Sequence, residues 1–156
     1  MPNRLTRLER IHIRAPIYFV TACTAERKPL LAHADVHETF LAFAREGTAH
    51  GAWIGAYVLM PDHLHALVRL DDDGGILSTW MKAMKGALSR QLRQMGMAAP
   101  HWQKGFFDHV LRSEESAAQK WEYIRGNPVR AGLVAKWNDW PYAGEIFPVE
   151  YRSERL

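Results

Sequence analysis

Two β-type segments joined by a two-residue turn constrain this fold more than any other feature. Residues 52–60 (AWIGAYVLM) and 63–70 (HLHALVRL) flank Pro61 and Asp62, which are typical turn residues, so the stretch predicts an antiparallel hairpin. Side chains alternate along a strand, so residues 64, 66, 68 and 70, all apolar, should share the core face. The other face then presents two imidazoles, His63 and His65.

The segments before the hairpin read as a strand and a helix. Residues 17–23 (IYFVTAC) are rich in β-branched and aromatic side chains and predict a first strand. Residues 35–47 have apolar positions at helical spacing. We expect Asp35 as the N-cap of this helix and Gly47 as its C-terminal stop.

The segments after the hairpin repeat this alternation. Residues 77–95 predict the longest helix, with an apolar stripe and a separate basic face. Residues 106–112 (FFDHVLR) predict a fourth strand. A further helix follows, with Ser113 as N-cap and Pro128 as the residue that stops it.

The order β-α-β-β-α-β plus a final helix predicts an α+β, ferredoxin-like fold with an antiparallel sheet. Its two helices should cover one face and leave the other open for a ligand, while the additional C-terminal helix carries Tyr123. A chain of 156 residues suits a single domain, residues 1–156, with a basic N-terminal arm (1–15) and a C-terminal tail (141–156).

Composition restricts the compartment and the partners. The one cysteine, Cys23, cannot form an internal disulfide, and no apolar run is long enough to span a bilayer, so we expect a cytoplasmic protein with no membrane partner. The net charge is +3, but basic residues gather in residues 1–30 and 82–130. This distribution favours a polyanion such as nucleic acid, although solvated surface charge explains it equally well.

The two histidines suggest a metal site on the open face. Two ligands are too few for a stable site, so a third must come from elsewhere. Tyr123 and Asn127 are four residues apart and share one helix face, so Asn127 could supply an oxygen close to the Tyr123 hydroxyl. The alternatives stay open: solvent-exposed strand histidines, a surface tyrosine, and an asparagine that only ends a helix before proline.

Three pieces of the chain carry a family resemblance: YVLMPDHLHALV, HWQKGFFDHVLR and YIRGNPVRAGLV, in this order. Together with IYFVTACTAERKPLL and WNDWPYAG, they resemble the single-tyrosine HUH transposases, and within them the REP-associated tyrosine transposases. The resemblance implies an enzyme that cleaves and rejoins single-stranded DNA near a hairpin through a covalent 5′-phosphotyrosine. Its partners would be single-stranded and hairpin DNA, and it would act at the bacterial nucleoid as a monomer or homodimer.

The resemblance also assigns roles to single residues. His63, His65 and Asn127 match the ligands of a divalent cation, Mg²⁺ or Mn²⁺, and Tyr123 matches the nucleophile. Asp108 and His109 fall in a motif to which we assign a supporting role, and Arg125 is a candidate for helping Tyr123 to ionise. The residues expected to contact DNA are basic, namely Arg4, Arg7, Arg10, Arg14, Lys82, Lys85, Arg112, Lys120, Arg125 and Arg130, with Trp102 as a stacking candidate.

Two other functions fit the same residues. A catalytically idle protein of this fold would bind hairpin DNA without forming a covalent adduct. A metal-dependent phosphodiesterase would use water in place of Tyr123.

Overall fold

The computed structural model describes residues 15–72, 74–111 and 117–149. Its strands and α-helices are β1 (Ile17–Cys23), α2 (Ala34–Gly47), β2 (Ala52–Leu59), β3 (His63–Leu70), α3 (Leu77–Gln94), β4 (Phe107–Val110), α4 (Ala117–Arg130) and β5 (Ala143–Glu145). Short 3₁₀ turns, η1 (Ala25–Arg27), η2 (Thr48–His50) and η3 (Trp137–Asp139), join some of them. Within these residues, no helix is both long and apolar enough to cross a membrane.

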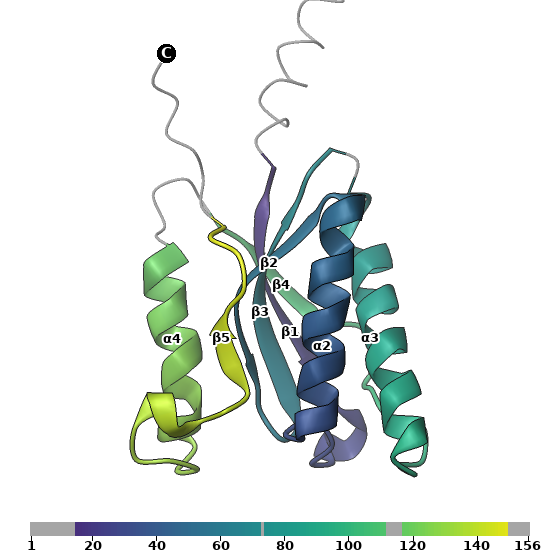
Figure 1. Cartoon of the computed structure of the whole chain (residues 1–156), viewed down its shortest axis with the longest axis vertical. Helices are drawn as coiled ribbons and strands as arrows, with labels where there is room; N and C mark the ends of the chain where they lie inside the picture. Colours follow the sequence, from purple (N-terminus) through teal and green to yellow (C-terminus); the bar gives the residue numbers. More distant parts are fainter. Residues whose placement is uncertain (1–14, 73, 112–116, 150–156) are drawn as a thin grey trace, which may run out of the picture.

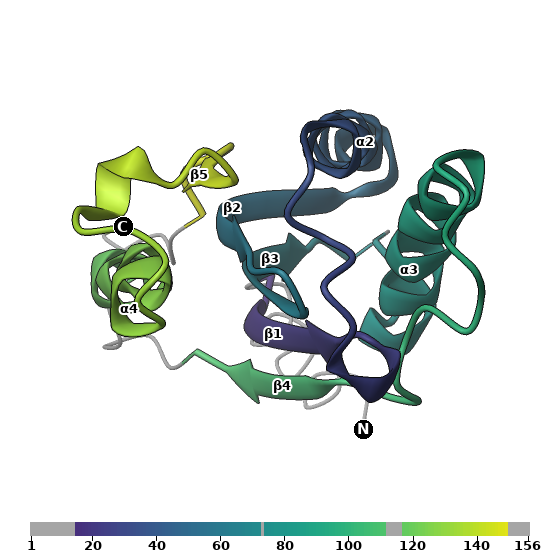
Figure 2. The same ribbon diagram turned by 90° about the horizontal axis from the view of Figure 1, so that it is seen from below.

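The strands form one antiparallel sheet in the order β4-β1-β3-β2-β5. Helices α2 and α3 lie on one face, and α4 lies on the other side of the sheet (Figures 1 and 2). The predicted α+β class, the order of the elements and the placement of two helices on one face are confirmed. The second face is not left open, however, because α4 packs against β2 and β3.

The hairpin follows the predicted side-chain alternation. In β3, Leu64, Ala66, Val68 and Leu70 are buried in the core shared with α2 and α3. Leu67, whose side chain points to the opposite face of the sheet, belongs to a second apolar cluster that includes Ile124 of α4. The sheet therefore has a core on each face, and the histidines of β3 point toward the one that includes α4.

Helix α2 begins and ends differently from the prediction. Asp35 is not the N-cap, since the helix starts at Ala34 and Asp35 lies in its first turn, where a carboxylate favours the positive helix end. Gly47 does not stop the chain's helical path, which continues through the 3₁₀ turn η2. The stop is Gly51, whose φ of 77° is a left-handed conformation that favours glycine.

Helix α4 continues past the proline that we expected to end it. Pro128 lies inside the helix, and the chain leaves it at Gly132, which has a φ of 74°. There the Leu133 amide donates to the Pro128 carbonyl and the Gly132 amide to the Val129 carbonyl, as in a Schellman motif. Pro128 has no amide hydrogen to donate to the preceding turn, but the helix continues to Arg130 and Gly132 supplies the termination.

Three other predictions bear on the ends of the chain and of this helix. The N-terminal arm and Ser113 lie outside the described residues. Part of the predicted C-terminal tail, Ala143–Glu145, is strand β5, which pairs with β2 at the sheet edge. The tail therefore contributes to the sheet that holds the histidines.

Candidate active site

His63 and His65 lie side by side on the α4 face of β3, with ring centroids 4.9 Å apart. His65 is buried, and the side chain of His63 keeps 15% of its surface exposed. The neighbouring strand β1 contributes Phe19, whose ring stacks on His65 with centroids 5.2 Å apart. His65 is therefore held against the Phe19 ring, and His63 lies beside it with part of its surface exposed.

Hydrogen bonds fix the orientation of both rings. The Nδ1 atom of His63 lies 2.8 Å from Oδ1 of Asp62, and Nδ1 of His65 lies 2.7 Å from Oγ1 of Thr21. An ionised carboxylate can only accept, so His63 carries a proton on Nδ1 and, in its neutral form, keeps a lone pair on Nε2. Each ring thus has Nε2 left as its remaining donor atom for a cation.

Asn127 meets this pair from α4. Its side-chain amide nitrogen lies 3.4 Å from Nε2 of His63. Rotation of the amide by 180° exchanges its nitrogen and oxygen, so the carbonyl oxygen can occupy the same position. Asn127 is inside α4, where its backbone carbonyl accepts from the amide of Ala131, and so it is not a helix-ending residue.

Tyr123 lies one helical turn before Asn127 on the same side of α4. Its ring is 6.2 Å from that of His65 and 6.0 Å from that of Phe19, measured between centroids. The residue is 51% exposed, so its hydroxyl is accessible to a large substrate. The guanidinium of Arg130 lies 4.4 Å from the ring centroid and donates to the Tyr123 carbonyl.

The cation beside Tyr123 is not the one we expected. Arg125 lies over Trp137 and pairs with Glu122 instead. Residues two apart on a helix point in different directions, whereas Arg130 comes seven residues, or two turns, after Tyr123. Arg130, and not Arg125, is therefore the arginine in contact with the Tyr123 ring.

Burial and charge favour the neutral form of the His65 imidazole, the form that can bind a metal. Burial, followed by the nearby charges of His63, Arg130 and Arg27, lowers the pKa of His65 to about 4. Burial alone would raise the pKa of Asp62, but hydrogen bonds from His63 and Arg27 and the charge of Arg27 outweigh it, and the net pKa is lowered. Asp62 is thus a carboxylate at neutral pH, able to hold the His63 proton.

Sequence reasoning missed Arg27. Its Nε atom lies 2.9 Å from Oδ2 of Asp62, and Nη1 donates to the sulfur of Cys23. Arg27 and Glu26 have φ values of 55° and 54°, a left-handed conformation that is unusual outside glycine. No spacing in the sequence indicates this turn, although the position of Asp62 directly before His63 could have marked the carboxylate.

The donor set suits a divalent cation that also binds phosphate. Two imidazole nitrogens and one amide oxygen leave several coordination positions for water and phosphate oxygens, as Mg²⁺ and Mn²⁺ require. Among the described residues, no group of three or more His, Cys, Asp or Glu side chains is placed to hold a metal. A third ligand beside His63 and His65 would therefore have to be of another type, such as the amide oxygen of Asn127.

A family model described as "Transposase IS200 like" matches residues 14–127, a range that contains both histidines, Tyr123 and Asn127. The chain belongs to the IS200-like transposase family. A Haemophilus influenzae protein assigned as a REP-associated tyrosine transposase is 24% identical, over 94% of this chain and 93% of its own length. The REP-associated tyrosine transposase of Escherichia coli is 22% identical, over 96% of this chain and 93% of its own.

A solved structure supports the fold of the transposase. The structure of a REP-associated tyrosine transposase bound to a REP hairpin matches with a TM-score of 0.65 and 24% sequence identity. The match covers 84% of this chain and 77% of the other.

Asp108 and His109, for which we predicted a supporting role, point to opposite faces of β4. Asp108 pairs with Val20, which belongs to the core with α2 and α3, and His109 pairs with Phe19, which contacts Tyr123. Residues directly opposite in an antiparallel pair share a face. The register therefore places His109 on the face of the candidate site and Asp108 on the other.

The predicted DNA-binding residues are distributed unevenly. Lys120 and Arg130 lie near the candidate site, over Phe19 and Tyr123, and Lys82 is exposed on α3. Lys85 donates to backbone carbonyls of Gln103 and Gly105, and burial lowers its pKa. Five further residues lie outside the described ranges, namely Arg4, Arg7, Arg10, Arg14 and Arg112.

The chain itself thus covers the part of the basic face of α3 around Lys85 and Ser89, whereas Lys82 stays exposed. The loop after α3 packs onto it, and the indole nitrogen of Trp102 donates to the Lys85 carbonyl and the Ser89 hydroxyl. Trp102 also packs against the core with α2 and α3. Lys85 and Trp102 therefore hold this loop against α3.

Proposed function

We propose that this transposase cleaves and rejoins single-stranded DNA beside a hairpin, with Tyr123 as the nucleophile. One observation carries the proposal: Tyr123 and Asn127 lie on the same side of α4, where Tyr123 stands beside His65 and Asn127 contacts His63. Residues 58 and 64 positions apart in the chain thus converge on the face that a phosphodiester would approach.

His63, His65 and Asn127 would hold the divalent cation. When bound, the cation would supply the positive charge that an anionic phosphodiester requires before an oxygen nucleophile can attack it. Asp62 would keep the His63 proton on Nδ1, and Thr21 would orient His65. Arg130, Lys120 and Arg27 provide positive charge around this set of residues for the DNA backbone.

The reaction would follow from the position of Tyr123. Its phenolic oxygen would attack the phosphorus, form a Tyr123–phosphate ester with the 5′-phosphate and lose its proton to the surroundings, while the bond to the 3′ oxygen breaks and yields a 3′-hydroxyl. Attack of a 3′-hydroxyl on the ester would rejoin the strand and return the tyrosine. No nucleotide cofactor is needed, because the ester retains the energy of the broken bond.

The relatives suggest the DNA substrate. The matching solved structure is of a transposase bound to a REP hairpin, and the curated relatives are named for the same elements. We therefore propose that this chain also binds a hairpin that carries a single-stranded flank.

The test is a search for the covalent adduct. Incubation with Mn²⁺ and single-stranded oligonucleotides that contain hairpins from the protein's own genomic neighbourhood should yield a protein–DNA species that survives denaturation. Tyr123→Phe should abolish the adduct and the cleavage while hairpin binding remains. The matched control Tyr142→Phe removes a hydroxyl from a ring that packs on Trp140 and His37 rather than on His63 or His65, and it should retain the adduct.

Two outcomes would replace the proposal. Cleavage that persists in Tyr123→Phe would identify a phosphodiesterase that uses water. Hairpin binding by the unmodified protein with neither cleavage nor adduct, over a range of metals, would identify a DNA-binding protein that has no nuclease activity.

A further inference from the structure

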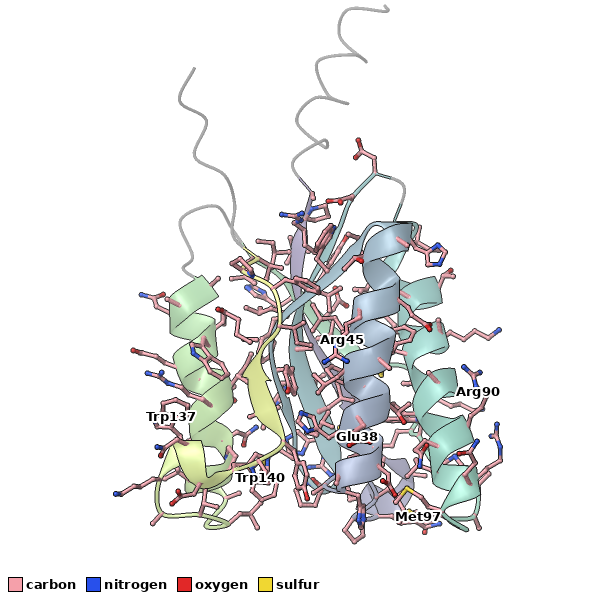
Figure 3. All side chains as sticks on the ribbon, viewed as in Figure 1. Glu38, Arg45, Arg90, Met97, Trp137 and Trp140 are labelled. Atoms are coloured by element: carbon pink, nitrogen blue, oxygen red, sulfur yellow. The ribbon has the colours of Figure 1, made fainter. Side chains whose placement is uncertain are left out.

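A groove of about 530 Å³ lies on the side of α4 that faces away from the sheet. Arg125, Val129 and Arg130 line it from the helix, and Lys136 and Trp137 line it from the chain that follows. Figure 3 shows Trp137 beside α4, separated by β5 from Arg45 of α2. The volume lies within the range of about 300–1,000 Å³ that is typical of small-ligand pockets.

The groove is positively charged. It contains Arg125, Arg130 and Lys136, against one carboxylate, Glu122, which lies 3.8 Å from Arg125 and is largely exposed. A solvent-exposed Arg–Glu ion pair at this distance is weak, so Glu122 offsets little of the positive charge in the groove. A ligand of negative charge is therefore favoured over a neutral or cationic one.

The groove also offers an aromatic ring. Trp137 is 43% exposed although two neighbours hold it: the guanidinium of Arg125 lies 4.6 Å from its centroid, and the Trp121 ring meets it edge-on at 6.1 Å. These contacts order the indole while leaving part of it accessible. An ordered, accessible indole between cations is the arrangement on which an unpaired nucleobase stacks.

Arg130 connects the groove to the candidate active site. It lines the groove and also lies over the Tyr123 ring, 4.4 Å from its centroid. Gly126 permits this path, because a Cβ atom at that position would come 2.7 Å from Nη1 of Arg130. A strand that passes Tyr123 can therefore continue into the groove along one arginine side chain.

We propose that this groove binds the single-stranded DNA that adjoins the scissile phosphate, with a base stacked on Trp137 and phosphates contacting Lys136 and Arg130. This proposal rests on the proposed function of Tyr123, because it assigns the path of the same substrate. Single-stranded DNA fits better than a duplex, since paired bases are stacked on one another and cannot cover the indole.

The experiment measures binding in the Tyr123→Phe background, so that cleavage does not interfere. Two probes are compared: a hairpin with single-stranded flanks on both sides, and the same hairpin without flanks. Trp137→Ala should bind the flanked probe roughly five- to 100-fold more weakly, the range expected for loss of one stacked base, while affinity for the bare hairpin stays unchanged. Trp137→Phe keeps an aromatic ring on which a base can stack, so its affinity for the flanked probe should fall much less.

The charge is tested by the salt dependence of the same binding. Lys136→Ala should reduce the slope of log affinity against log salt by about 0.7 for the flanked probe, because one phosphate contact to a single strand is lost. Arg45→Ala removes the same charge from an exposed position on α2 and should leave the slope unchanged. A melting curve for each variant establishes that the fold is retained.

The proposal is overturned if Trp137→Ala retains the full preference for the flanked probe, or if it weakens both probes equally, which would indicate a duplex or a damaged fold. Failure of the proposed function gives a different result. The wild-type protein would then form no covalent adduct with DNA, but its stronger binding of the flanked probe would still depend on Trp137.

Discussion

The two faces of the sheet share the same strands but differ in what those strands present. Toward α2 and α3, β3 contributes only apolar residues, which join Phe40, Met84 and Leu88 in the larger core. Toward α4, the alternate residues of β3 include His63 and His65, and α4 adds Tyr123 and Asn127 beside a smaller apolar cluster. The period of two along one strand thus separates the residues that stabilise the fold from those proposed to act on DNA.

This separation predicts that mutations on the two faces have different effects, and the largest effect on stability should come from the α2 and α3 face. Phe40 is fully buried, with its ring 5.0 Å from that of Tyr57. Phe40→Ala should lower the free energy of unfolding by about 3–5 kcal/mol, through lost burial and an unfilled cavity. Urea unfolding measures this loss.

The comparison variant is on the other face. Tyr123→Phe removes one oxygen from a half-exposed ring and should change the unfolding free energy by less than about 0.5 kcal/mol. A similar loss of stability in both variants would show that the two faces are not separate in function.

The second prediction concerns Asn127, which connects α4 to His63. Asn127→Ala removes the amide oxygen, and cleavage at low Mn²⁺ should fall by at least the 10- to 100-fold typical for loss of a residue that only supports a metal ligand. Raising Mn²⁺ should restore part of the activity. Asn127→Asp keeps an oxygen at nearly the same position and should retain metal binding.

The matched measurement is a titration of Mn²⁺ against both cleavage and melting temperature. A metal response in Asn127→Ala that equals the wild-type response would remove Asn127 from the proposed site. Because Asn127 lies inside α4, a small loss of stability without a metal effect would instead indicate a packing role.

Much of the fold was predictable because its signals are local. The bounds of β1 and β3 were predicted from β-branched and aromatic runs bounded by turn residues, and α3 from its apolar stripe. The shared face of His63 and His65 follows from alternation alone, and the shared side of Tyr123 and Asn127 from helical spacing.

The remaining features depend on tertiary contacts that no local pattern reports. The position of α4 across the second face follows from burial of Ile124 and Trp121 against strands far away in sequence. Arg27 reaches Asp62 only because the chain adopts left-handed backbone angles before it. Lys85 looked like a surface charge, but the loop around Trp102 folds back onto it.

The third prediction tests the residues that support His63. Asp62→Asn removes the negative charge that holds the proton on Nδ1, so the affinity for Mn²⁺ should fall by about 10- to 100-fold. Calorimetry of Mn²⁺ binding measures this directly. Asp71→Asn is the control, because Asp71 lies just beyond the same hairpin and pairs with Arg69 and Trp53, away from the histidines. An equal loss of affinity in both variants would assign the effect to the hairpin rather than to His63.

The last and smallest effect is the pH dependence of stability, measured with a chelator present. Burial lowers the pKa of His65 to about 4, whereas an imidazole in the unfolded chain has its ordinary value near 6.5. Below pH 6.5 the unfolded state therefore binds more protons than the folded state. The free energy of unfolding falls as the pH is lowered from about 6.5 to about 4. The loss through His65 alone should be about 1 kcal/mol between pH 6.5 and 5.5.

His37 acts in the same direction from the α2 side of the sheet, because burial also lowers its pKa. His65→Gln and His37→Gln should each make the profile of unfolding free energy against pH less steep in this window, and the effects should add because the two residues lie on opposite faces. If the pH profile of His65→Gln equals that of the wild type, His65 is solvated in solution. The α4 face would then present its histidines to water, as an ordinary exposed strand surface does, and burial of His65 would no longer distinguish it.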